Sequence, residues 1–122
     1  MREVRFRFKK FKVCQDAKNF CKFCREIVDK YIEPKDRDLA SQIKRALHSL
    51  VLNIAEGSAD ISDIEFARFL GISIRSAYET VSGFDLALLY GLITEEVNEK
   101  IETDAHDLVK QLSAFRHSLI LG

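Results

Sequence analysis

The sequence has no tryptophan, a single proline and only five glycines among its 122 residues. Glycine and proline are the residues that most often form turns and interrupt helices, so this chain has few places to turn. Their scarcity favours a few long helices over many short strands. No uncharged apolar run is long enough to cross a membrane, and the chain begins with alternating Arg and Phe, so we expect neither a membrane span nor a secretory signal.

Charged residues are balanced in number but unevenly distributed, with 19 Lys and Arg against 19 Asp and Glu. Residues 1–30 carry ten basic against four acidic side chains, and residues 31–122 carry nine against fifteen. This asymmetry predicts a basic arm on a mildly acidic body, the alternative being a merely solvated N-terminus. The basic residues of the arm are Arg2, Arg5, Arg7, Lys9, Lys10 and Lys12.

The three cysteines, Cys14, Cys21 and Cys24, lie in one short stretch. Without an export signal we expect reduced thiols in a cytoplasmic protein. The C-x-x-C spacing of Cys21 and Cys24 occurs in zinc and redox sites, but here it falls inside a predicted helix with no further thiol or histidine nearby. We interpret these cysteines as core residues and expect no metal site.

Four segments show the apolar spacing of amphipathic helices, namely residues 11–32, 36–56, 62–90 and 94–120. Short connections between them predict a single all-α domain, an antiparallel up-down four-helix bundle preceded by a short extended arm at residues 1–10. In the arm, EVRFRFKKF alternates apolar and basic side chains, which predicts a strand. We expect this strand to pair or dock within an oligomer, the alternative being a disordered arm.

Particular residues mark the expected helix ends. Asp36 can cap the second helix, and Gly57 is predicted to close it in the left-handed conformation. Ser62 and Glu65 form a capping box, in which the Ser62 side chain accepts a hydrogen bond from the Glu65 amide and the Glu65 side chain reaches back. Gly91 closes the third helix.

Polar side chains share one edge of the second helix. If Asn53 and Glu56 are buried there, they must be hydrogen-bonded, since an unpaired buried carboxylate is strongly destabilising. We expect the donors to be amides of the turn at 57–62 together with Arg or Ser side chains, and the motif to fix this corner and the register of an interface. Its residues are Gln42, Arg45, Ser49, Asn53, Glu56, Gly57, Ser62, Glu65, Ser73 and Ser76.

The third helix carries a stripe of small residues spaced by three and four. Such a stripe lets another helix approach closely, so we expect a second packed face against a neighbouring helix or subunit, the alternative being a polar outer face. The stripe comprises Ser73, Ser76, Thr80, Gly83 and Ala87.

No pattern typical of catalysis is present. The three histidines lack the Glu-x-x-His spacing of di-iron bundles, and none follows an Arg after four to six intervening residues, as in one type of bundle ribonuclease. The chain has neither a glycine-rich phosphate loop nor a Ser/His/Asp pattern. We therefore expect no enzymatic activity, no catalytic residue and no cofactor. A catalytic role for Glu56 is the alternative.

Residues 8–93 resemble the small proteins encoded in bacterial 23S rRNA intervening sequences. The most specific part is Asn53-Ile54-Ala55-Glu56-Gly57 with the Ser62, Glu65-Phe66 and Ser76 that follow it. The similar segments are FKKFKVCQDAKNF, SQIKRALHSLVLNIAEGSADISDIEFARFLGISIRSAYE and ALLYGLI.

The resemblance implies an antiparallel four-helix bundle that assembles into a homopentameric ring. A related branch, the accessory proteins of diversity-generating retroelements, is strongly basic and binds nucleic acid and a reverse transcriptase. This chain departs from that branch in its net charge of zero and carries Cys14 where the family often has an aromatic residue.

We therefore expect a non-enzymatic, cytoplasmic homo-oligomer that contacts RNA or a ribonucleoprotein, such as the ribosome, through the basic arm. The alternative is a protein–protein adaptor or structural ring that does not bind nucleic acid.

Overall fold

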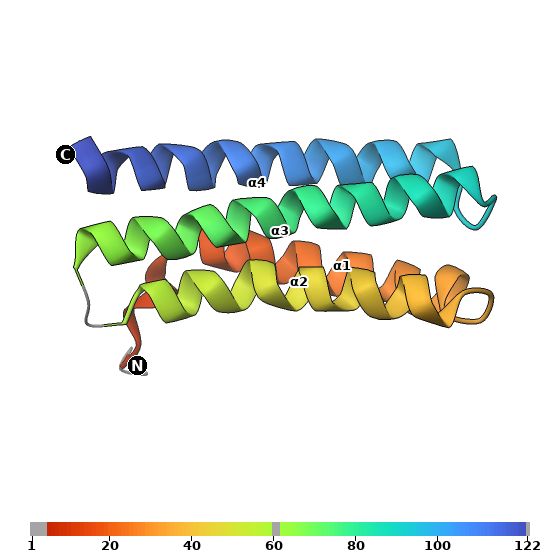
Figure 1. The fold of residues 1–122 in the computed structure, drawn as a ribbon, viewed down its shortest axis with the longest axis horizontal. Helices are drawn as coiled ribbons and strands as arrows, with labels where there is room; N and C mark the ends of the chain where they lie inside the picture. Colours follow the sequence, from red (N-terminus) through yellow and green to blue (C-terminus); the bar gives the residue numbers. More distant parts are fainter. Residues whose placement is uncertain (1–4, 60–61, 122) are drawn as a thin grey trace.

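The computed structural model describes residues 5–59 and 62–121. Four long helices run antiparallel beside one another, which confirms the predicted all-α four-helix bundle (Figure 1). None of the described helices is both long and apolar enough to cross a membrane. The helices are α1 (Lys12–Ile27), continued by the π-helix η2 (Val28–Ile32), then α2 (Arg37–Gly57), α3 (Asp63–Leu89) and α4 (Glu95–Leu121).

The core is built from the apolar stripes of all four helices, which supply fully buried side chains such as Val28, Leu47, Phe84 and Leu108. Where α1 begins, an aromatic cluster joins the N-terminal segment to the helix ends. The ring of Phe115 stacks edge-on against Phe11, with centroids 5.2 Å apart, and against Phe66, with centroids 5.1 Å apart. Such edge-to-face pairs stabilise beyond the area they bury.

The described part of the predicted strand, residues 5–11, is not extended as a strand, and residues 3 and 4 of that prediction lie outside the described residues. Arg7–Lys10 form a 3-10 helix, η1, and the Phe11 amide donates to the Phe8 carbonyl at 3.2 Å. This winding packs Phe8 and Phe11 against the core. A strand would need a partner for its backbone groups, whereas burying two phenylalanines within the chain needs none.

Side-chain caps begin α2 and α3. Asp36 accepts a hydrogen bond from the Leu39 amide at 3.0 Å, and Ser62 accepts one from the Glu65 amide at 3.2 Å. The reciprocal half of the predicted capping box is not formed. The Glu65 carboxylate instead pairs with Arg68 at 3.0 Å on the outer face of α3.

Gly57 does not close α2 in the left-handed conformation, as predicted, but lies inside its last turn. Among the described residues, the glycine with a positive φ is Gly91, just after α3, where φ is 75°. Position 57 has no room for a side chain. A Cβ atom there would lie 2.7 Å from Cβ of Phe69 and 2.8 Å from the ring of Phe66. The missing side chain therefore lets the first turns of α3 pack closely against the end of α2.

The small-residue stripe of α3 packs against α2 of the same chain. Ser73 is fully buried, and its hydroxyl donates to the Leu50 carbonyl at 2.6 Å. A Cβ atom on Gly83 would lie 2.5 Å from Cγ1 of Ile43. The close approach that the stripe permits is thus used between α2 and α3, while α4 packs against another side of α3 (Figure 1).

Candidate nucleic-acid interface

One basic residue of the predicted arm is held in place by contacts with the bundle. Arg7 donates through Nε to the Ser58 carbonyl at 2.7 Å, and its guanidinium lies over the Phe66 ring, 5.3 Å from the centroid. Arg7 therefore fixes η1 to the end of α2 and the start of α3, although the residue remains exposed. Arg5, Lys9, Lys10 and Lys12 are exposed as well, and Arg2 lies outside the described residues.

Lys12 takes part in a contact between α1 and α4. Its ammonium lies 2.6 Å from the Asp16 carboxylate, which also accepts a hydrogen bond from Gln111 at 3.1 Å. The hydrogen bonds from Lys12 and Gln111 hold the pKa of Asp16 below its usual value, and the same Asp16 partner raises the pKa of Lys12. Lys12 thus balances an acidic neighbour and adds little free positive charge to the arm.

A groove of about 380 Å³ between α1 and α2 has a basic rim. Lys18, Lys22 and Arg25 line it from α1, and His48 lines it from α2. The three α1 cations are exposed and are spaced by four and three residues, so they lie on one face of the helix. No carboxylate is among the groove's lining residues in the described part of the chain, so phosphate would meet only neutral or cationic groups here.

The floor of this groove is apolar. Cys21 and Val51 are half-buried, and Leu52 is 61% exposed. Burial raises the pKa of the Cys21 thiol, so this floor residue is uncharged near neutral pH. The groove therefore places cations around a neutral, apolar surface.

Leu52 also lines a second hollow, of about 980 Å³, beneath the N-terminal segment. Arg5 and Phe6 line this hollow as well, but so do the acidic Glu56 and Asp63. Its charges are therefore mixed. Leu52 lines both hollows, so the α1–α2 groove and the hollow at the N-terminal segment adjoin each other.

The polar motif of α2 makes a helix–helix contact through Ser49. Asn53 is half-buried, and its Nδ2 donates to the Ser49 carbonyl at 2.8 Å and to the Ser49 hydroxyl at 3.0 Å. The Ser76 hydroxyl of α3 donates to the Ser49 hydroxyl at 2.7 Å. Glu56, in contrast, is exposed, so the burial considered for this carboxylate is not observed. The remaining α2 members, Gln42 and Arg45, are also exposed.

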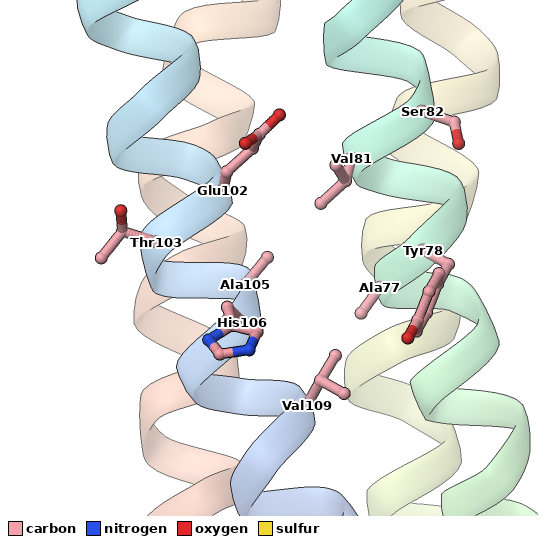
Figure 2. Close-up of a pocket in the computed structure, with 9 residues that line it drawn as sticks. All are labelled: Ala77, Tyr78, Val81, Ser82, Glu102, Thr103, Ala105, His106 and Val109. Carbon is pink, nitrogen blue, oxygen red and sulfur yellow. The ribbon is translucent and has the colours of Figure 1, made fainter.

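A third hollow, of about 550 Å³, lies between α3 and α4 (Figure 2). Ser82 lines it from α3, and Glu102 and His106 line it from α4. Within residues 5–59 and 62–121 no hydrogen bond joins these three side chains. Nor do the described residues contain a cluster of three His, Cys, Asp or Glu suited to a metal ion.

The sequence placed the candidate binding residues within the first twelve positions and did not single out Lys18, Lys22 and Arg25, which line the groove. Their helical spacing within the basic first thirty residues was the available signal. The contribution of His48 was not visible, because it depends on which face of α2 packs beside α1.

Fold and surface together define an antiparallel four-helix bundle with a basic groove between its first two helices. Residues 9–114 match the family described as 23S rRNA-intervening sequence protein, and the chain belongs to this family. The predicted resemblance is thus confirmed.

The chain is also similar to the crystal structure of a protein of unknown function from the S23 ribosomal protein family of Bacteroides thetaiotaomicron. The two share 24% sequence identity with a TM-score of 0.78, over 85% of this chain and 97% of that chain. This likeness shows the fold. None of the curated proteins compared matches the sequence.

Proposed function

We propose that this protein is a non-enzymatic RNA-binding protein that contacts RNA or a ribonucleoprotein through the α1–α2 groove and the exposed N-terminal segment. The observation that carries the proposal is the groove itself, whose charged lining residues are all basic. Arrays of Lys and Arg on one face of a fold are the electrostatic footprint of nucleic-acid binding. Arg5 lines the adjoining hollow, and the exposed Lys9 and Lys10 add positive charge to the N-terminal segment.

The family name supplies the first RNA to test. It refers to intervening sequences of 23S rRNA, so a structured 23S rRNA fragment is the natural candidate and a ribosome-associated role the natural setting. The free thiols of all three cysteines agree with a reducing, cytoplasmic location in a bacterium.

The proposal includes assembly into a homopentameric ring, as the family resemblance implies. It is supported by large apolar side chains that remain exposed on α3 and at its C-cap, where contact with a second copy would cover them. These are Tyr78 (65% exposed), Leu86 (42%), Leu89 (76%) and Tyr90 (56%). Five copies would present five basic grooves to one RNA, which raises the overall affinity without any new contact.

The test removes the groove charge and measures RNA binding. A variant with Lys18, Lys22 and Arg25 replaced by Gln is compared with a control in which Lys35, Arg75 and Lys110 are replaced by Gln. Both lose three positive charges, but the control residues lie outside the groove. We expect the groove variant to bind a fluorescent 23S rRNA fragment at least about tenfold more weakly and the control to stay close to wild type.

Equal losses in the two variants would show that only net charge matters and would contradict the assignment of the groove. Binding that does not weaken as salt rises would contradict phosphate recognition altogether.

A second candidate function is a protein–protein adaptor ring that does not bind nucleic acid. The exposed apolar side of α3 and the adjoining α3–α4 hollow favour it. Absence of RNA binding at low salt, from protein whose oligomeric mass is confirmed by light scattering, would select this candidate.

A further inference from the structure

The three groove cations are spaced so that they can contact the backbone of a single nucleic-acid strand. Lys18, Lys22 and Arg25 lie on one face of α1 and span about 10 Å along its axis, at 1.5 Å per residue. All three are exposed, so their charged ends can follow a strand that runs along the groove. His48 lines the groove from α2, so a strand lying here has cationic or titratable groups on both sides.

The apolar floor distinguishes a single strand from a duplex. In A-form RNA the paired bases face inward, and the accessible surface consists largely of phosphates and hydroxyls. Such a surface has no apolar group to place against Val51 and Leu52. An unpaired base can turn away from its strand and lay its apolar face on this floor.

Phe6 provides a stacking surface in the hollow that adjoins the groove. Its ring is 63% exposed, whereas Phe8 and Phe11 pack against the core. Phe6 lines the hollow that shares Leu52 with the groove. Glu56 and Asp63 line this hollow together with Arg5 and Arg7, so its mixed charges attract phosphate less than the groove does, and an uncharged base fits here.

We infer that the α1–α2 groove binds a single strand of RNA, with successive phosphates on Lys18, Lys22 and Arg25 and an unpaired base stacked on Phe6. This inference rests on the proposed function and specifies the form of RNA that the groove takes. Base–aromatic stacking tolerates any base, so the selectivity concerns strandedness rather than sequence.

The experiment compares a fluorescent single-stranded RNA with the same strand annealed to its complement. Wild type, Phe6→Ala and Tyr31→Ala are titrated with each RNA. Tyr31 is the matched control because it is an exposed aromatic residue (42%) in η2 that lines neither the groove nor the adjoining hollow. Light scattering and circular dichroism establish that all three proteins share the same fold and mass.

Wild type is expected to bind the single strand about tenfold or more tightly than the duplex, with a log–log salt slope of about −2 for three phosphate contacts. Phe6→Ala is expected to lose about tenfold with the single strand and nothing with the duplex, and Tyr31→Ala to match wild type.

Equal or tighter binding of the duplex would overturn the inference and leave RNA binding by the groove standing. Wild-type affinity of Phe6→Ala for the single strand would overturn the stacking role. Absence of binding to either RNA would overturn the proposed function as well.

Discussion

Arg7 and Ser58 are 51 positions apart in the sequence, and the Arg7 Nε donates to the Ser58 carbonyl at 2.7 Å. This contact ties the N-terminal segment to the end of α2, where the carbonyl groups of the last helical turn have no partner within the helix. A residue predicted to bind nucleic acid thus has a structural contact. Other basic residues that a ligand could contact lie on α1, where Lys18, Lys22 and Arg25 line the groove.

Replacing Arg7 with Gln should lower the free energy of unfolding by about 1–2 kcal/mol, because the charged hydrogen bond to Ser58 and the contact with the Phe66 ring are both lost. Arg5→Gln is the control, since Arg5 is exposed on the same segment and should stay within about 0.5 kcal/mol of wild type. Urea unfolding followed by circular dichroism measures both. Equal midpoints for wild type and Arg7→Gln would show that the contact contributes nothing.

Gly57→Ala should destabilise the bundle by about 1–3 kcal/mol, because the new methyl group would overlap Phe69 and the Phe66 ring. Gly71→Ala is the matched control within a helix. The nearest atom to its Cβ outside the local backbone is Arg116 Nε at 3.4 Å, so this change should be neutral or stabilising by up to about 1 kcal/mol through helix propensity. Thermal melts of the two variants should therefore move apart, and a stabilised Gly57→Ala would refute the packing role.

Two isosteric changes test the polar motif of α2. Asn53→Asp removes the donor that binds both oxygens of Ser49 and places a carboxylate beside a carbonyl, which should cost about 1–2 kcal/mol. Glu56→Gln changes an exposed side chain and should stay within about 0.5 kcal/mol. Urea unfolding measures the free energy of unfolding of both variants and of wild type. A large loss for Glu56→Gln would mean that an assembly buries this residue.

The stability of the protein should depend on pH through Asp16, whose pKa is lowered by hydrogen bonds from Lys12 and Gln111. A lowered carboxyl pKa stabilises the folded state above the ordinary value near about 4, and the stabilisation is lost as pH falls through the folded-state pKa. Asp16→Asn should therefore lower the free energy of unfolding at neutral pH, by a small amount because the pair is largely exposed, and leave it unchanged near about pH 2. The same difference from wild type at both pH values would contradict this assignment.

The bundle could be predicted because local rules agree with it. Apolar residues recur at helical spacing, and the caps at Asp36 and Ser62 form as their positions in the sequence suggest. Gly57 was misassigned because glycine suits both a left-handed helix end and a close helix crossing. Only the contact with Phe69, across the turn between α2 and α3, distinguishes the two uses.

The site could be predicted only as a region. The excess of Lys and Arg in the first thirty residues indicated where positive charge gathers, but not which cations remain available. That depends on contacts between distant segments, such as Arg7 with Ser58. The strand was wrong for a related reason, since Phe8 and Phe11 find their partners in the core of the same chain.

The claim that RNA occupies the α1–α2 groove is tested most directly by the reactivity of Cys21. This residue lines the groove, while Cys14 and Cys24 are fully buried and serve as internal references. Because Lys18 and Lys22 separate the three cysteines, tryptic digestion places each on its own peptide for mass spectrometry.

Alkylation by N-ethylmaleimide is followed with and without single-stranded RNA, at mildly alkaline pH because burial raises the pKa of the Cys21 thiol. The account predicts that RNA slows alkylation of Cys21 in proportion to the fraction bound and that high salt restores the rate. An unchanged Cys21 rate under saturating RNA would show that RNA, if bound, lies elsewhere on the protein, and would contradict the account.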